Sequence, residues 1–186
     1  MNTICYSWQA EISEEHCEAI KALYFEGNTK QAEVGNVSNI DKLTRSSNIL
    51  PCPFDSQNGV YLDRIMHKYI TIANRNAFGV NLNGFQEFQI AKYGKGDFYD
   101  YHIDSFLKPN ICSQRKLSVT VQLSDSIDYV GGDFEFSKTT GELDRKKARE
   151  KGTILVFPSF LNHRVTEVTK GERFSLVGWY EGNDWI

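Results

Sequence analysis

Leu117-Ser-Val-Thr-Val-Gln-Leu123 is the stretch of sequence that decides the fold class. Apolar and polar side chains alternate along it, and a period of two is the pattern of a β-strand. Phe88 and Ile90 alternate with their polar or small neighbours in the same way. From Phe85 onward, therefore, we expect the chain to be rich in antiparallel strands.

The rest of the second half contains further short strand candidates separated by turn residues. They are a strand that follows Gly131-Gly132 and ends at Phe136, a buried apolar run at Thr153–Phe157, and a closing hairpin of His163–Val168 and Arg173–Tyr180 around the turn Thr169–Glu172. The segment Lys138–Lys151 is strongly charged. We expect it to form a solvated loop or a short helix.

The first half has the spacing of helices. Ser13 is a suitable N-cap, and the apolar positions that follow at helical spacing before Gly27 are Cys17, Ile20, Leu23 and Tyr24. A second helix is predicted from about Val60 to Phe78. Residues 28–58 are polar and contain two prolines, so we expect a loop there.

Helices followed by antiparallel strands predict an α+β fold, in which a β-sandwich or jelly roll carries the N-terminal helices on one sheet. The chain has 186 residues, which is the size of a single domain with a full hydrophobic core. We therefore expect residues 1–186 to form one domain, with a helix-rich supporting region at 1–84 and a strand-rich core at 85–186.

Composition excludes several classes of protein. Hydrophobic residues make up 40% of the chain and charged residues 24%, which is a globular balance rather than a disordered one. The 24 acidic and 21 basic residues leave a net charge of −3, which gives no general attraction for nucleic acid. No apolar run is long enough to span a membrane, and Met1–Ala10 lacks the pattern of a secretory signal.

The cysteines indicate a reducing environment. They have no CxxC or other metal-binding spacing, and they lie at Cys5, Cys17, Cys52 and Cys112. Scattered cysteines of this kind are typical of reduced thiols. We therefore expect a cytoplasmic protein.

Two histidines and one aspartate form the candidate site. His102 and Asp104 are two residues apart, so on an extended chain they point to the same side. His163 follows a second strand and a turn. Two imidazoles and one carboxylate, with open coordination positions, are the facial triad of non-haem Fe(II) oxygenases. Arg173, ten residues after His163, offers a fork for a carboxylate, and Ser175 on the same face is able to donate a further hydrogen bond.

The sequence here resembles the Fe(II)/2-oxoglutarate-dependent dioxygenases, and within them the prolyl 4-hydroxylase-like group. The resemblance runs from about Phe88 to Tyr180. Its motifs are Tyr93-Gly-x-Gly-x-x-Tyr99-x-x-His102-x-Asp104, Gly131-Gly132-Asp-Phe-Glu-Phe136, Phe157-Pro158, His163-x-Val165 and Gly171-x-Arg173-x-Ser175-x-x-x-Trp179. It implies that the core at 85–186 is a double-stranded β-helix, a jelly roll of antiparallel strands, with the N-terminal helices packed on its major sheet.

The resemblance also implies roles for individual residues. It implies that His102, Asp104 and His163 bind Fe(II), and that Arg173 and Tyr93 hold the C5 carboxylate of 2-oxoglutarate. Some relatives use a second tyrosine on the next strand, but residues 117–123 contain none.

Three further positions are candidate substrate contacts. Trp179 matches an aromatic residue close to the metal in the family, and Tyr99 precedes His102-x-Asp104 by the interval seen there, although the packing of a large ring explains each equally well. Arg164 follows His163 directly and must point away from the metal on an extended chain. It either meets the substrate or is solvated.

The implied reaction is hydroxylation of a prolyl residue in a peptide or protein, with O2 as cosubstrate and 2-oxoglutarate converted to succinate and CO2. A free amino acid or another small metabolite is the alternative substrate class. Repair of an alkylated nucleobase is disfavoured, because no basic run interleaved with aromatics is present. A non-oxygenase metal-binding jelly roll is the rival from a different class, but it has no need of Arg173.

Overall fold

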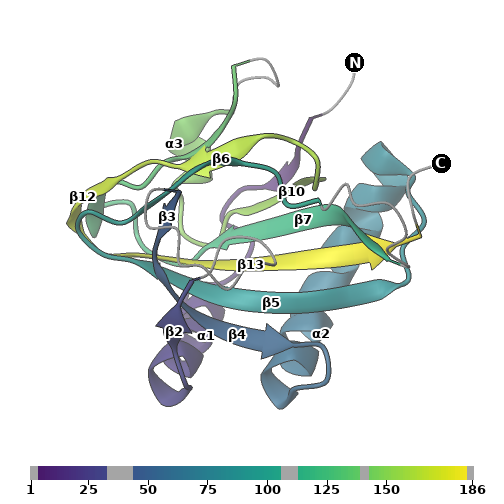
Figure 1. The fold of residues 1–186 in the computed structure, drawn as a ribbon, viewed down its shortest axis with the longest axis horizontal. Helices are drawn as coiled ribbons and strands as arrows, with labels where there is room; N and C mark the ends of the chain where they lie inside the picture. Colours follow the sequence, from purple (N-terminus) through teal and green to yellow (C-terminus); the bar gives the residue numbers. More distant parts are fainter. Residues whose placement is uncertain (1–3, 33–43, 106–112, 139–142, 184–186) are drawn as a thin grey trace.

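The computed structural model describes residues 4–32, 44–105, 113–138 and 143–183. Two layers of antiparallel strands face each other, and two long helices lie beneath the larger one (Figure 1). The helices are α1 (Glu14–Glu26), α2 (Gln57–Ala73) with a π-helical turn (Asn74–Phe78) at its end, and the short α3 (Arg145–Ala148).

The major sheet contains seven of the described strands, in the order β1-β10-β7-β13-β5-β4-β2. Their bounds are β1 Tyr6–Trp8, β10 Ile154–Pro158, β7 Gln114–Gln122, β13 Arg173–Gly182, β5 Gly84–Tyr93, β4 Asn48–Pro53 and β2 Lys30–Gln31. All of the pairings are antiparallel. Near the middle of this sheet, β7 and β13 are neighbours that pair along most of their length.

The minor sheet has the order β3-β6-β11-β9, and a two-stranded ribbon pairs β12 with β8. Their bounds are β3 Arg45–Ser46, β6 Phe98–His102, β11 His163–Val165, β9 Phe134–Phe136, β12 Val168–Gly171 and β8 Tyr129–Gly131. Two opposed antiparallel sheets of this kind make the expected jelly roll.

The alternation in β7 separates a hydrophobic core from a polar interior. Its apolar residues, including Val119 and Val121, pack with the helices in the larger core cluster. The residues between them, Ser118 and Thr120, face the space between the two sheets and are also buried. Both faces of the strand are therefore covered, one by helices and one by the opposing sheet.

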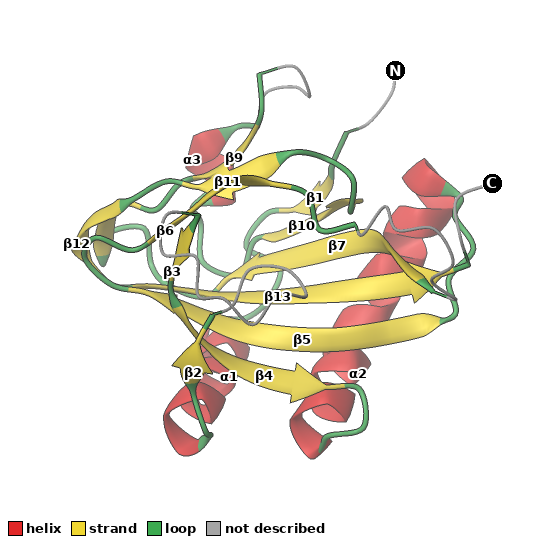
Figure 2. Cartoon of the chain, viewed as in Figure 1, coloured by secondary structure: helices red, strands yellow, loops and turns green. Residues whose placement is uncertain are grey.

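A serine caps each of the two long helices, but only the cap at Ser13 was predicted, and α2 begins three residues before the predicted start at Val60. Ser13 Oγ accepts a hydrogen bond from the His16 amide at the start of α1, and Ser56 caps α2 at Gly59 in the same way. Buried apolar residues of both helices pack in one core cluster with residues of the major sheet, and Figure 2 shows the two helices on one side of that sheet. None of the described helices is both long and apolar enough to cross a membrane.

The prediction that His163–Val168 and Arg173–Tyr180 form a closing hairpin is wrong. The segment that begins at His163 pairs with β6 and β9 in the minor sheet, and β12 pairs with β8. Arg173 begins β13, which pairs with β5 and β7 in the major sheet. The turn between β12 and β13 therefore carries the chain from one layer to the other, whereas nearness in sequence suggested direct pairing.

The expected loop at residues 28–58 is also wrong in part, because it contains β2, β3 and β4, with 33–43 outside the described residues. Pro51 and Pro53 argued against a strand, yet both belong to β4. β2 covers only Ile49 and Asn48, so the rest of β4 is an edge of the described sheet. An edge strand tolerates proline, because the missing N–H then removes no sheet hydrogen bond.

Candidate metal centre

His102, Asp104 and His163 converge at the facing ends of two strands. His102 ends β6 and lies directly opposite His163, which begins β11. One ligand atom from each of the three residues lies within 4.8 Å of the others. The Nε2 atoms of His102 and His163 are 3.5 Å and 3.6 Å from the two carboxylate oxygens of Asp104. The spacing leaves room for one cation between the three side chains.

Backbone carbonyls fix the orientation of both imidazoles. His102 Nδ1 is 2.8 Å from the carbonyl oxygen of Asp100, and His163 Nδ1 is 2.8 Å from that of Leu161. A carbonyl oxygen only accepts hydrogen bonds, so each Nδ1 carries a proton, and a neutral ring with that proton has its lone pair on Nε2. The lone pair of each Nε2 is then free to face the metal, as in known histidine metal sites.

The charge states of the triad also suit a divalent cation. Burial lowers the pKa of His163 to about 4, so its imidazole is neutral at pH 7. Burial by itself would raise the pKa of Asp104, but His163, His102 and the Ser118 hydroxyl hold it well below its ordinary range. Two imidazoles and one carboxylate therefore make a donor set that fits Fe(II).

Two serines hold the carboxylate of Asp104 in place. Ser118 on β7 donates a 2.7 Å hydrogen bond to Asp104 Oδ2, and its hydroxyl is 2.9 Å from that of Ser159. The backbone carbonyl of Ser159 accepts hydrogen bonds from the amides of Asp104 and Ser105. The sequence analysis did not single out either serine, although Ser118 is a polar position of the alternating strand.

Arg173 lies in the same pocket as the triad. It begins β13 opposite Tyr93 on β5, and its guanidinium carbon is 5.5 Å from the centre of the Tyr93 ring. Its Nη1 donates a 3.2 Å hydrogen bond to Ser175 Oγ. All three residues are at least 97% buried. No carboxylate of the described residues pairs with Arg173, so its fork is open to a bound anion.

The remaining walls of the pocket are largely aromatic and apolar. The pocket is lined by Arg45, Tyr93, Tyr99, His102, Asp104, Thr120, Phe134, His163, Val165, Arg173, Ser175, Val177 and Trp179. One pocket thus combines a candidate metal-binding triad, a buried arginine and apolar walls.

Comparison with known proteins agrees with this geometry. The sequence profile of the 2OG-Fe(II) oxygenase superfamily matches residues 88–181, a range that contains the triad and Arg173. The chain belongs to the 2OG-Fe(II) oxygenase superfamily. Members of this superfamily use Fe(II), 2-oxoglutarate and O2.

Curated relatives of this oxygenase are PKHD-type hydroxylases. The chain is 35% identical over 92 residues to one from Idiomarina loihiensis, which covers 50% of this chain and 40% of that protein. It is 37% identical over 94 residues to one from a Synechococcus species, and this match covers 50% of this chain and 41% of that protein. The matched region is thus about two fifths of the length of these relatives.

Solved structures share the fold over almost the whole oxygenase chain. A viral collagen prolyl hydroxylase from Paramecium bursaria Chlorella virus-1 superimposes with a TM-score of 0.73 at 17% identity, covering 97% of each chain. A prolyl-4-hydroxylase from Pseudomonas putida gives a TM-score of 0.71 at 22% identity, covering 95% of this chain and 91% of that chain. These likenesses establish a jelly roll of the prolyl hydroxylase type.

Two of the three candidate substrate residues of this oxygenase lie in the pocket. The Tyr99 ring stacks on His102, with ring centres 3.4 Å apart and planes 10° apart. Trp179 is 6% exposed, and its Nε1 has no hydrogen-bond partner in the described part of the chain. Both side chains therefore face the space beside the metal position.

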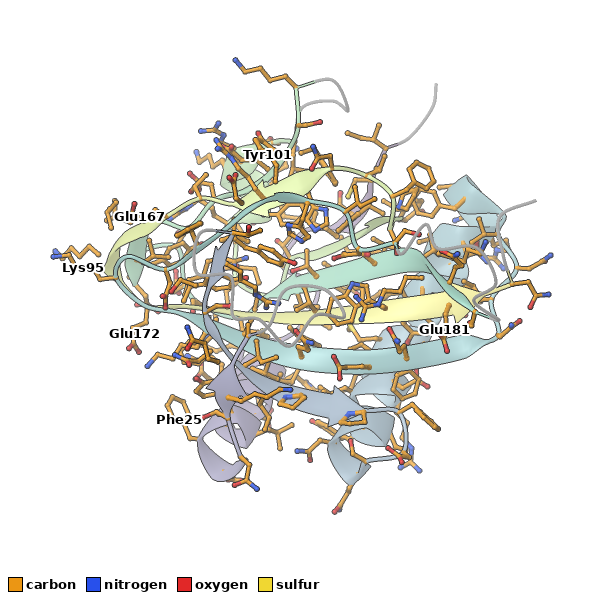
Figure 3. The ribbon with its side chains drawn as sticks, in the orientation of Figure 1. Phe25, Lys95, Tyr101, Glu167, Glu172 and Glu181 are labelled. Carbon is orange, nitrogen blue, oxygen red and sulfur yellow. The ribbon has the colours of Figure 1, made fainter. Side chains whose placement is uncertain are left out.

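Arg164 lies outside the pocket. Its Nε donates a 2.9 Å hydrogen bond to Glu135, and its guanidinium lies 4.7 Å from the ring centre of Tyr101. Figure 3 shows Tyr101 on the outer side of the minor sheet, away from the major sheet. That Arg164 binds substrate stays a prediction, and such a contact would lie outside the pocket.

Proposed function

We propose that residues 1–186 act as a single Fe(II)- and 2-oxoglutarate-dependent dioxygenase domain that hydroxylates a prolyl residue in a peptide or protein. The reaction couples this hydroxylation to conversion of 2-oxoglutarate into succinate and CO2. One observation carries the proposal: the triad lies in the same pocket as Arg173, which has no carboxylate partner among the described residues.

The cosubstrate is held at two places in this scheme. Arg173 binds the C5 carboxylate of 2-oxoglutarate with its guanidinium fork, and a guanidinium keeps its charge at every physiological pH. Ser175 orients that fork through its hydrogen bond to Nη1. Tyr93, directly opposite Arg173, adds its hydroxyl to the same carboxylate.

The other residues of the pocket exclude water and hold the metal. When bound to His102, Asp104 and His163, Fe(II) supplies the redox chemistry that joins decarboxylation to hydroxylation by O2. The neighbouring side chains Phe134, Val165 and Val177 are apolar. A dry pocket strengthens the electrostatic contacts inside it and protects the oxidising centre from side reactions.

Two exposed apolar residues that adjoin site residues in sequence support a peptide rather than a small metabolite as substrate. Ile103, between two metal ligands in sequence, is 41% exposed. Phe160 is 46% exposed and follows Ser159, whose carbonyl accepts from the Asp104 amide. Exposed apolar side chains of this kind favour an interaction with another chain. The structural neighbour that is a collagen prolyl hydroxylase favours the same substrate class.

We also propose a reducing, cytoplasmic location for this activity. Cys5, Cys17 and Cys52 are free thiols in the described structure, and Cys112 lies outside the described residues. Reduced thiols are typical of such a compartment, which also keeps iron in the ferrous state.

Mass spectrometry tests the proposed reaction. The chain, supplied with Fe(II), ascorbate and 2-oxoglutarate, is incubated with a panel of proline-containing peptides. We expect a gain of one oxygen atom on proline, with an equimolar yield of succinate. Oxidation of free proline alone would favour the small-metabolite alternative. Absence of any charge-transfer band after anaerobic addition of Fe(II) and 2-oxoglutarate would instead indicate a non-oxygenase metal site.

A further inference from the structure

Arg45 is a second buried arginine in the pocket, which the sequence analysis did not identify. It begins β3, pairs with Tyr99 on β6 and is 5% exposed. Its side chain lines the pocket together with the triad and Arg173. The positive charge of the pocket therefore comes from two arginines on opposite sheets.

The contacts of Arg45 leave most of its donors unused. Its Nε donates a 2.9 Å hydrogen bond to Ser47 Oγ. Its guanidinium carbon lies 4.5 Å from the centre of the Tyr99 ring, which in turn stacks on His102. Within the described ranges, no carboxylate pairs with Arg45 and no side chain or carbonyl accepts from its terminal amino groups. The guanidinium is thus held by Ser47 and Tyr99 but is not neutralised.

Tyr99 does not supply the missing negative charge. Tyr99 carries a phenol, which is an uncharged group under ordinary physiological conditions, so the ring next to Arg45 brings no negative charge. A buried cation without a counter-charge is costly, because it loses its hydration without gaining a partner. An anion that arrives with a ligand would remove this cost.

The charges in the pocket indicate which ligand brings that anion. One carboxylate in the wall, that of Asp104, neutralises one of the two charges of Fe(II). The two carboxylates of 2-oxoglutarate balance the other iron charge and Arg173. Arg45 then remains as the one unbalanced cation among the described residues of the pocket, and only the substrate is left to pair with it.

We propose that Arg45 binds a carboxylate carried by the substrate, on the hydroxylated residue or beside it. The inference rests on the proposed function, since it assumes that iron and 2-oxoglutarate occupy the rest of the pocket. The Tyr99 ring contacts both Arg45 and His102. A carboxylate bound to Arg45 would therefore be separated from the metal-binding side chains by this ring. An acidic side chain next to the target residue and the α-carboxylate of a free amino acid offer the same chemistry.

Binding to the complete chain loaded with Mn(II) and 2-oxoglutarate tests the proposal without turnover. The probes are two matched pairs, Ac-Ala-Glu-Pro-Ala-NH2 against its glutamine counterpart, and L-proline against L-prolinamide. Wild type should bind the carboxylate member of one pair about tenfold or more tightly than its neutral counterpart, as measured by calorimetry. The pair that shows the preference identifies the source of the carboxylate.

Variants of Arg45 show whether the preference comes from this residue. R45Q should abolish it, and R45K should retain part of it because the charge remains. R64Q, on the exposed surface of α2, is the matched control and should preserve it. Circular dichroism confirms that R45Q is folded, and its Kd for 2-oxoglutarate should stay within about twofold of wild type.

Other results would overturn the inference. If wild type does not prefer either carboxylate probe, including the case in which no probe binds, Arg45 has no such role. A preference for the carboxylate probe that persists in R45Q would also show that Arg45 has no such role. A large rise in the 2-oxoglutarate Kd of R45Q would assign Arg45 to the cosubstrate instead. Failure of wild type to bind 2-oxoglutarate at all would contradict the proposed function itself, and this inference with it.

Discussion

The Ser118 hydroxyl donates a 2.7 Å hydrogen bond to Asp104 Oδ2, the carboxylate oxygen that lies 3.6 Å from His163 Nε2. The bond fixes the rotation of the carboxylate relative to the two imidazoles. Outer hydrogen bonds of this kind change metal affinity by roughly 10–100-fold in proteins. The polar face of β7 is therefore part of the metal site.

Replacing Ser118 with alanine should weaken metal binding without unfolding the chain. S118A removes the hydrogen bond, so we expect the Mn(II) Kd to rise by roughly 10–100-fold in calorimetry. S118T keeps the hydroxyl and is the matched control. An unchanged Kd in S118A would show that the orientation of Asp104 does not depend on this contact.

Removing a triad ligand should abolish metal binding. H163A leaves only two ligands, which is too few for a stable site, so added Mn(II) should no longer raise the melting temperature. H67A changes an exposed histidine on α2 and should leave the metal-dependent shift intact. A full shift in H163A would remove His163 from the metal site.

The sequence predicted the triad and Arg173 because these residues lie in motifs of fixed spacing. It could not predict Ser118 and Arg45, whose roles depend on which distant segments meet. Ser118 lies on β7 of the major sheet and contacts Asp104, which follows β6 of the minor sheet, and Arg45 lies on β3, which pairs with β6. A lone arginine before two serines has no local signal of burial.

Strand pairing was predicted less well than strand existence. The alternation in β5 and β7 was clear, and both strands were confirmed. The partner of the segment at His163 was predicted wrongly, because a jelly roll pairs strands that are far apart in sequence. Short strands of two or three residues, such as β3, contain too few side chains for a period to appear.

Arg173 should control the affinity for 2-oxoglutarate. R173Q keeps the shape of the side chain but removes the charge, so the Kd for 2-oxoglutarate should rise by about tenfold or more in the Mn(II)-loaded chain. R173K should lie between R173Q and wild type, since it keeps the charge but loses the fork. R64Q is the surface control. Equal Kd values for R173Q and wild type would exclude Arg173 as the carboxylate ligand.

Cys52 should be chemically inert in the folded chain. It is fully buried, and burial raises the pKa of its thiol to about 12. The thiolate is the reactive form, so iodoacetamide at pH 8 should modify Cys52 only after urea is added, as peptide mass spectrometry will show. The raised pKa also stabilises the fold below about pH 9, and this contribution is lost as the pH rises toward 12. Rapid labelling without urea would contradict the described burial.

Gly132 should be needed for the position of Arg173, because its backbone lies against that side chain. Its φ angle is +63°, and a Cβ atom at this position would lie 3.0 Å from Arg173 Cδ and 2.9 Å from Val168 Cγ2. G132A should therefore lower the melting temperature and also raise the Kd for 2-oxoglutarate. Gly79 has the same φ angle, but its Cβ atom would meet nothing within 4 Å. G79A therefore introduces backbone strain without a side-chain clash. It should lower the stability by about 1 kcal/mol and leave the Kd for 2-oxoglutarate unchanged. If both variants lose stability equally and neither changes the Kd, the contact between Gly132 and Arg173 does not shape the cosubstrate site.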